Sequence, residues 1–148
     1  MIEIWNRWIA AFDKAFTTDD WTDAKGFLTD DVAYVVAGVP FACELRGRDQ
    51  VIAGFRKSLE NFDRKFDSRL WEAVDLKVWA DHAVTGLAKG RYEINGKPPI
   101  TFSARSAWFF RGEQISLMTD IYDANEINAM KTLEWLALHG ADMDASYI

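Results

Sequence analysis

A chain of 148 residues, of which 49% are hydrophobic, is long enough to bury its own core, so we expect a single domain over residues 1–148. Its formal net charge of −6 argues against nucleic acid and against an anionic membrane surface as partners, because both select clustered Lys and Arg. With one cysteine, no signal-peptide pattern at the start and no apolar run long enough to cross a membrane, a cytoplasmic protein without disulfides is expected.

The first part of the chain predicts two helices. Apolar side chains recur at three- and four-residue steps from Ile4 to Phe16, which places them on one face of a helix that ends near Thr17. Thr18 or Asp19 is suited to cap a short second helix, because a side-chain oxygen there accepts free amide hydrogens of the first turn.

A strand and a third helix are expected next. Residues 32–36, VAYVV, predict a strand that Gly38 and Pro40 stop. Asp49 follows Gly47 and is expected to cap the helix. The buried stripe of that helix is expected to contain Val51, Ile52, Phe55, Leu59 and Phe62.

Most of the chain between residues 66 and 121 predicts sheet. From Phe66 to Val78 most even positions are apolar and most odd positions are charged, so the even side chains are expected to face the core. Asn95-Gly96 is expected to form a two-residue type I′ turn, and residues 111–113 a second turn. These turns separate three antiparallel strands.

A last helix is expected after Asp123, which suits its N-cap, with Ile127, Met130, Leu133 and Ala137 on one stripe. The order of elements predicts the α+β class. We expect a cone-shaped, curved and mostly antiparallel sheet wrapped around the N-terminal helices, followed by a C-terminal helix.

Three motifs in this order resemble the nuclear transport factor 2-like superfamily, and within it the SnoaL-like branch of polyketide cyclases, ketosteroid isomerases and limonene-epoxide hydrolases. The motifs are residues 28–34 (LTDDVAY), residues 45–49 (LRGRD), and residues 109–115 (FFRGEQI) leading to 120–123 (DIYD). The resemblance covers nearly the whole chain. It implies a cystatin-like α+β roll with an apolar pocket at the open end of the cone, a homodimer through the outer face of the sheet, a small apolar ligand and no cofactor.

The ketosteroid isomerase pattern is disfavoured. It needs a carboxylate base two positions beyond Tyr34, where Val36 stands. It also needs a protonated carboxyl on the strand that contains Ser106, and Ser106 sits closest to that place.

The limonene-epoxide hydrolase pattern fits better. Asp120 in DIYD resembles the aspartate that activates water, and Arg91 with Glu93 stands in for the charged residues that assist it. Tyr34 resembles a tyrosine that holds the water, although Val36 replaces the asparagine that helps it.

The candidate catalytic residues are therefore Asp120, Arg91 and Tyr34. The residues expected around the ligand are Trp8, Phe16, Trp21, Val36, Phe55, Glu93, Ser106, Trp108 and Met118. His and Cys show no metal-ligand spacing, so no metal site is expected.

Alternatives remain open at this point. Strict alternation would bury Ile115, Leu117, Thr119 and Ile121 and turn Asp120 to solvent, and Arg91 with Glu93 would then be a surface pair. The chain is accordingly expected to bind a small apolar molecule and to perform proton-transfer or water-addition chemistry, such as that of an isomerase, a cyclase or an epoxide hydrolase. The alternatives are a non-catalytic ligand-binding or dimerisation module, or an assembly domain with a filled core.

Overall fold

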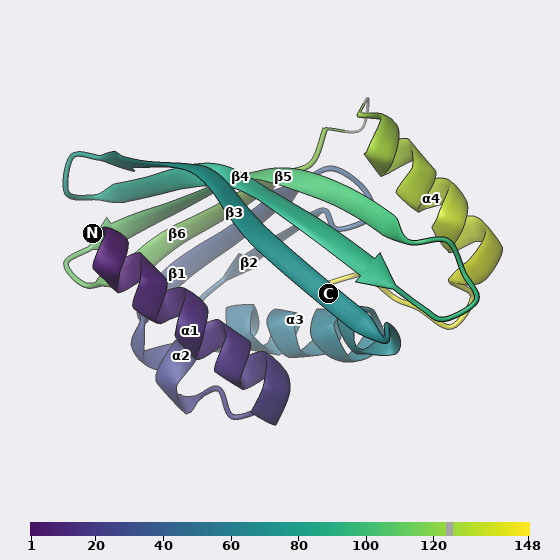
Figure 1. Cartoon of the computed structure of the whole chain (residues 1–148). Helices are drawn as coiled ribbons and strands as arrows, with labels where there is room; N and C mark the ends of the chain where they lie inside the picture. The colour runs from purple at the N-terminus through teal and green to yellow at the C-terminus, as the bar shows by residue number, and fades with distance from the viewer. Residues whose placement is uncertain (124–125) are drawn as a thin grey trace.

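The computed structural model describes residues 1–123 and 126–148, which form a six-stranded sheet with helices on its concave face and at one end (Figure 1). The helices are α1 (Ile2–Thr18), α2 (Thr22–Gly26), α3 (Arg48–Asn61) and α4 (Ile127–His139), with a short 3-10 turn, η1 (Asp63–Lys65), after α3. The strands are β1 (Leu28–Ala37), β2 (Cys43–Arg46), β3 (Ser68–Trp79), β4 (Ala83–Glu93), β5 (Ile100–Arg111) and β6 (Gln114–Ile121).

The strand order in the sheet is β2-β1-β6-β5-β4-β3, and only the β1–β6 pair is parallel. Figure 1 shows α1, α2 and α3 beneath the curved sheet and α4 beyond the start of β5. This arrangement confirms the expected α+β class and the expected cone-like sheet.

The helices at the start of the chain confirm the expected elements and correct their caps. Helix α1 ends at Thr18, and Asp19 follows it with a left-handed φ of 57°. Asp20, rather than Thr18 or Asp19, accepts a hydrogen bond from the Thr22 amide at 3.0 Å where α2 begins. Gly47, rather than Asp49, occupies the N-cap position of α3.

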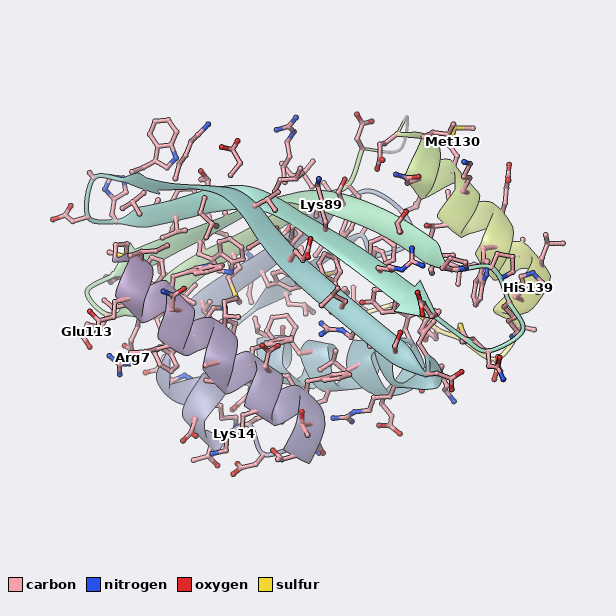
Figure 2. The ribbon with its side chains drawn as sticks, viewed as in Figure 1. Arg7, Lys14, Lys89, Glu113, Met130 and His139 are labelled. Carbon is pink, nitrogen blue, oxygen red and sulfur yellow. The ribbon has the colours of Figure 1, made fainter. Side chains whose placement is uncertain are left out.

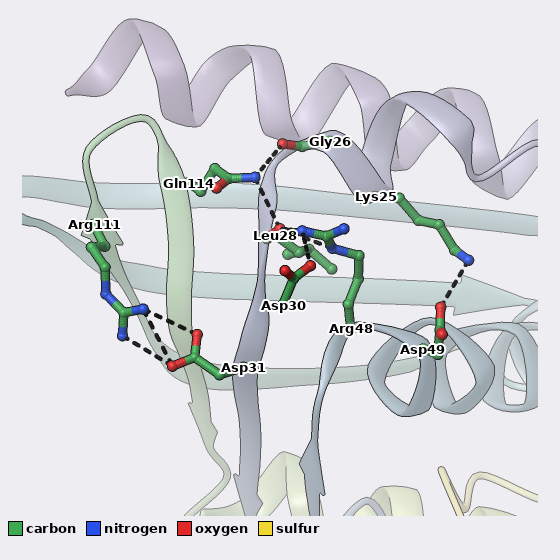
Figure 3. A network of polar contacts seen from close by, with 9 residues as sticks. All are labelled: Lys25, Gly26, Leu28, Asp30, Asp31, Arg48, Asp49, Arg111 and Gln114. Atoms are coloured by element: carbon green, nitrogen blue, oxygen red, sulfur yellow. Dashed lines mark hydrogen bonds and ion pairs between the residues drawn. The ribbon is translucent and has the colours of Figure 1, made fainter.

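The start of β1 is fixed by side chains from three other elements (Figure 3). The Leu28 carbonyl accepts hydrogen bonds from Arg48 at 2.7 Å and from Gln114 at 3.1 Å. Arg111 pairs with Asp31 at 3.1 Å. The register between β1 and β6 shifts between positions 28 and 33, and the Arg48 and Gln114 side chains satisfy a backbone carbonyl next to this irregularity.

The predicted facing of β3 is wrong before the bulge in this strand and correct after it. Leu70 is 56% exposed, whereas Trp71 faces the interior. Beyond the bulge, Leu76 packs against the core as expected. A bulge near Asp75, which has a φ of 53°, shifts the pairing with β4 between Val74 and Lys77. Because an extra residue reverses the alternation, no single odd–even rule describes this strand.

The two turns are present, but the first differs from the expected type. Lys97 donates its amide to Ile94 at 3.1 Å, and of the two central residues only Gly96 has a positive φ, 77°. A type I′ turn needs a positive φ at both, so this is not one. Gly112, with a φ of 63°, lies in the tight turn between β5 and β6 as expected.

The predicted stripe of α4 is also wrong. Ile127 is 64% exposed and Met130 52% exposed, and the buried side chains are Ala129, Thr132 and Trp135. The Trp135 indole donates to the Pro98 carbonyl at 2.8 Å. Glu126 occupies the N-cap position, so Asp123 is not the cap, and residues 124–125 of the predicted helix start lie outside the described residues.

After α4 the chain returns to α3, where Asp144 donates its amide to Asn61 at 3.0 Å and Ala145 is buried. Figure 2 shows side chains filling the space between the sheet and the helices, with Lys89 on the opposite, outer face of the sheet. None of the described helices is both long enough and apolar enough to cross a membrane.

Candidate functional site

A cavity of about 210 Å³ lies between the sheet, α1 and α3. Its walls are largely aromatic, and the indoles of Trp5, Trp8, Trp71 and Trp108 come from three different elements. A cavity of about 150 Å³ holds a benzene molecule, so this space is sufficient for a small organic ligand.

The carboxyl group of Asp120 lines this aromatic cavity from β6. The Tyr34 hydroxyl donates a hydrogen bond to Asp120 Oδ2 at 2.6 Å, and the Ser106 hydroxyl donates to Oδ1. Tyr34 comes from β1 and Ser106 from β5, the two neighbours of β6 in the sheet. The carboxyl is therefore held on both sides by hydroxyl groups.

Asp120 faces the interior because β6 is irregular. Phe109 pairs with Leu117 but Phe110 pairs with Ile115, so Ser116 is an extra residue in the strand. The bulge allows Ile115 and Met118 both to be buried, although three positions separate them. It turns Asp120 inward and leaves Ile121 52% exposed, so strict alternation fails.

Burial raises the pKa of Asp120, because the charged form loses water in the domain interior, and the hydrogen bonds from Ser106 and Tyr34 only partly oppose this. The described contacts of Asp120 include no cation. Burial and the nearby Asp120 charge also raise the pKa of Tyr34 well above its ordinary value, so this hydroxyl keeps its proton. The raised pKa makes Asp120 a stronger base than an exposed carboxylate, which suits it to accept and return a proton.

Arg91 does not lie with Asp120, which corrects the expected pairing. Arg91 and Glu93 are on β4 and form an ion pair at 2.7 Å, with about half of each side chain exposed. Their neighbours Gly90 and Tyr92 face the core, and alternation then places Arg91 and Glu93 on the outer face.

Some of the other predicted ligand contacts line the cavity, and the rest do not. Those that line the cavity are Trp8, Phe55, Ser106, Trp108 and Met118. Trp21 and Val36 are buried outside the cavity lining, Trp21 stacked on Phe55 and Val36 beside Asp120 in the strand register. Phe16 packs against the Arg69 guanidinium at 4.6 Å.

Sequence reasoning missed Tyr147, which follows α4 in the chain. Its ring lies 5.4 Å from the Tyr34 ring, and the two hydroxyl oxygens are 3.5 Å apart. No periodicity marks a single aromatic residue in an irregular segment, so the sequence carries no signal for it.

Sequence reasoning also missed a polar cluster on the β3 side of the cavity. Asp63 accepts hydrogen bonds from Arg69 at 2.7 Å and from the Tyr92 hydroxyl at 2.5 Å. The Trp71 indole donates to the same hydroxyl at 2.7 Å. Alternation had assigned Arg69 to the solvent side, and the bulge in β3 explains the error.

No three His, Cys, Asp or Glu side chains within residues 1–123 and 126–148 are grouped as a metal ion requires. Cys43 is buried, and burial raises the pKa of its thiol to about 11, so it is a poor nucleophile.

Comparison with known proteins identifies the fold. No family model and no curated protein matches the sequence, but many solved structures match the fold. TerC co-crystallised with polyporic acid is 16% identical, with a TM-score of 0.65 over 92% of this chain and 97% of that one. A protein of unknown function from Burkholderia pseudomallei, described as nuclear transport factor 2-like, is also 16% identical, with a TM-score of 0.65 over 95% and 97%.

An LEH-like epoxide hydrolase from M. tuberculosis is 18% identical, with a TM-score of 0.59 over 89% of this chain and 93% of that one. Identities this low show the fold alone. The chain therefore has the nuclear transport factor 2-like fold, as its resemblance to that superfamily implied.

Proposed function

We propose that this protein binds a small, mostly apolar molecule in the aromatic cavity and moves a proton on it, with Asp120 as the acid–base group. The observation that carries the proposal is a carboxyl group inside an aromatic cavity, held by the hydroxyls of Tyr34 and Ser106. Two solved relatives of the fold support ligand binding, since TerC was co-crystallised with polyporic acid and a ketosteroid isomerase-like protein was solved in complex with trimethylamine.

The chemistry follows from the environment of Asp120. Its raised pKa makes the carboxylate a stronger base than an exposed one. It takes a proton from a carbon next to a carbonyl group, so that the C–H bond breaks, a carboxyl O–H forms and an enolate remains. Return of that proton to a different atom of the enolate completes an isomerisation. Tyr34 and Ser106 orient the carboxylate throughout.

Epoxide hydrolysis is less well supported. In that template, charged residues beside the aspartate assist the epoxide oxygen, and Arg91 and Glu93 were the candidates. Both lie on the outer face of the sheet, paired with one another. The carboxylate base that proton transfer needs, Asp120, lies in the cavity.

A non-catalytic binding protein is the second candidate. Both oxygens of Asp120 already accept hydrogen bonds from protein hydroxyls, which favours a structural carboxylate. This candidate predicts that ligands stabilise the fold by about 2.7 kcal/mol at a hundredfold excess over Kd, with no turnover.

Deuterium exchange tests the proposal without knowledge of the product. Small aryl ketones are incubated with the protein in D₂O, and loss of the proton signal next to the carbonyl is followed by NMR. We expect exchange above the buffer rate, and we expect Asp120→Asn to lower it by about 10² to 10⁴. Quenching of tryptophan fluorescence shows whether the variant still binds the ketone.

The matched control is Asp81→Asn, because Asp81 lies in the turn between β3 and β4 with a fully exposed side chain. It should exchange like the wild type. Equal exchange by wild type and Asp120→Asn would remove Asp120 from the chemistry, and ligand stabilisation without exchange would establish the binding protein instead.

We also propose a homodimer through the outer face of the sheet. The proposal is supported by the exposed apolar side chains there, with Leu70 56%, Trp79 55% and Ile121 52% exposed. Side chains of this size are usually covered when they share one face of a sheet.

A further inference from the structure

The cluster of Asp63, Arg69, Tyr92 and Trp71 forms a second polar region of the cavity, at the β3 side of the sheet, whereas Asp120 lies on β6. All four residues line the cavity. Arg69 is on β3 and Asp120 on β6, three strand spacings apart, which is about 14 Å between backbones at ~4.8 Å per spacing. A ligand that contacts both regions must be elongated.

The Arg69 guanidinium is held in a fixed position. Its Nε–H donates to Asp63, and the Tyr92 hydroxyl also interacts with it. The Phe16 ring lies 4.6 Å from the guanidinium carbon and the Trp71 ring 6.0 Å. A guanidinium carries five N–H donors in a rigid fork, so most of its donors remain for another acceptor.

Those remaining donors have access to the cavity. Only 14% of the Arg69 side chain is exposed, and the residue lines the cavity. Among the described residues, the fully buried side-chain nitrogen and oxygen atoms without a partner are Trp5 Nε1 and Thr29 Oγ1. Any unpaired nitrogen of Arg69 is therefore not fully buried, and the cavity is a space that Arg69 lines.

The charges around the cavity exclude an anionic ligand. Asp63 already balances Arg69, and Asp120 adds a buried carboxyl. Asp13 and Glu72, both exposed, add two more carboxylates where α1 and β3 border the cavity. A carboxylate ligand would meet net negative charge, whereas a neutral carbonyl oxygen accepts a hydrogen bond from Arg69 without that repulsion.

From this geometry we infer that Arg69 determines ligand specificity by donating hydrogen bonds to a neutral carbonyl oxygen at the end of the ligand far from Asp120. The ligand class is an uncharged, elongated aromatic molecule with a carbonyl at that end, separate from any carbonyl beside which Asp120 moves a proton. This inference rests on the proposed use of the cavity for small molecules, and it holds whether or not Asp120 performs chemistry.

Binding of matched ligand pairs tests the inference. The pairs are 1-tetralone with tetralin, 9-fluorenone with fluorene, and 4-acetylbiphenyl with 4-ethylbiphenyl, measured by tryptophan quenching. In at least one pair the wild type should prefer the ketone, and Arg69→Gln should lower the ketone-to-hydrocarbon affinity ratio about tenfold or more. The affinity for the hydrocarbons should not change. A general loss of structure would instead weaken the binding of ketones and hydrocarbons alike.

Two further variants keep the test decisive. Arg69→Gln leaves Asp63 buried without its cation, so the double variant Asp63→Asn, Arg69→Gln is measured as well and should show the same lost preference. Arg64→Gln is the matched control, because Arg64 also packs over the Phe16 ring, at 5.8 Å, but is not among the residues that line the cavity. It should keep the preference of the wild type.

Several results would overturn the inference. They are a ketone preference that survives both Arg69 variants, tighter wild-type binding of biphenyl-4-carboxylate than of 4-acetylbiphenyl, and no binding of any ketone. If the wild type catalyses deuterium exchange but shows no ketone preference that depends on Arg69, this inference is rejected and the proposed function stands. Lost exchange in Asp120→Asn has no bearing on it.

Discussion

At the scale of single residues, the burial of Asp120 carries a cost in stability. The aqueous shell of its carboxylate is replaced by two hydroxyl donors and aromatic walls. Burial accordingly raises its pKa above the ordinary value of 3.8. Such a cost is typical of residues kept for a function rather than for folding.

The raised pKa gives a pH-dependent prediction. Below pH 3.8 the carboxyl keeps its proton in both the folded and the unfolded state, so its ionisation costs no stability. As pH rises through the raised pKa, the folded state loses stability, because the unfolded state releases the proton more readily. Asp120→Asn should therefore gain stability over the wild type as pH rises from 4 to 7. Urea unfolding at both pH values measures the free energy of unfolding of the two proteins. The contribution of the buried Asp63 cancels in their difference, because both proteins contain it.

The control for this prediction is again Asp81→Asn, whose fully exposed side chain should give no pH-dependent difference from the wild type. An Asp120→Asn variant whose stability relative to the wild type falls between pH 4 and pH 7 would show that its carboxylate stabilises the fold.

At the scale of elements, β4 is shaped to accept the Trp71 ring. A Cβ at Gly90 would lie 2.9 Å from the nearest carbon of that ring, closer than side chains tolerate. The absence of a side chain at Gly90 thus lets Trp71 lie flat on β4, where its indole donates to Tyr92.

Gly90→Ala should therefore displace Trp71. We expect a loss of about 1–3 kcal/mol in the free energy of unfolding, as for other overpacked sites, and weaker ligand binding. Denaturant unfolding and tryptophan quenching measure the two effects. Gly26→Ala is the control, because nothing lies within 4 Å of a Cβ there and an alanine in helix α2 should preserve or raise stability. Equal stability of the two variants would show that the β4 surface is not closely packed at Gly90.

The same elements show what a sequence can and cannot reveal. The apolar stripe of α1 and the turn at Gly112 depend on local patterns, and both could be predicted. The facing of Arg69 and Asp120 depends on bulges in β3 and β6, where one extra residue reverses the alternation. A bulge leaves no clear signal in one sequence, and Asp120 was placed in the pocket by resemblance rather than by alternation.

At the scale of the whole molecule, the outer face of the sheet predicts self-association. Trp79→Glu places a charge among the exposed apolar side chains of that face, so we expect the mass in solution to fall from that of a dimer to that of a monomer. Light scattering after gel filtration measures it.

Leu138→Glu is the matched control for association, since Leu138 is 77% exposed but lies on α4 rather than on the sheet. It should leave the mass unchanged. A wild-type protein with the mass of one chain at every concentration tested would reject the dimer.

Because β1 pairs with β6, which lies far along the sequence, the cavity is completed late during translation. Tyr34 on β1 emerges from the ribosome long before Asp120 and Tyr147, the residues that it contacts in the finished cavity. Until then, Trp5 of α1 has no Trp108 of β5 to pack against, and β1 has no β6 to pair with. Synthesis proceeds at about 5–20 residues per second, so the nascent chain exposes its tryptophans for several seconds, and cellular chaperones are needed most during that interval.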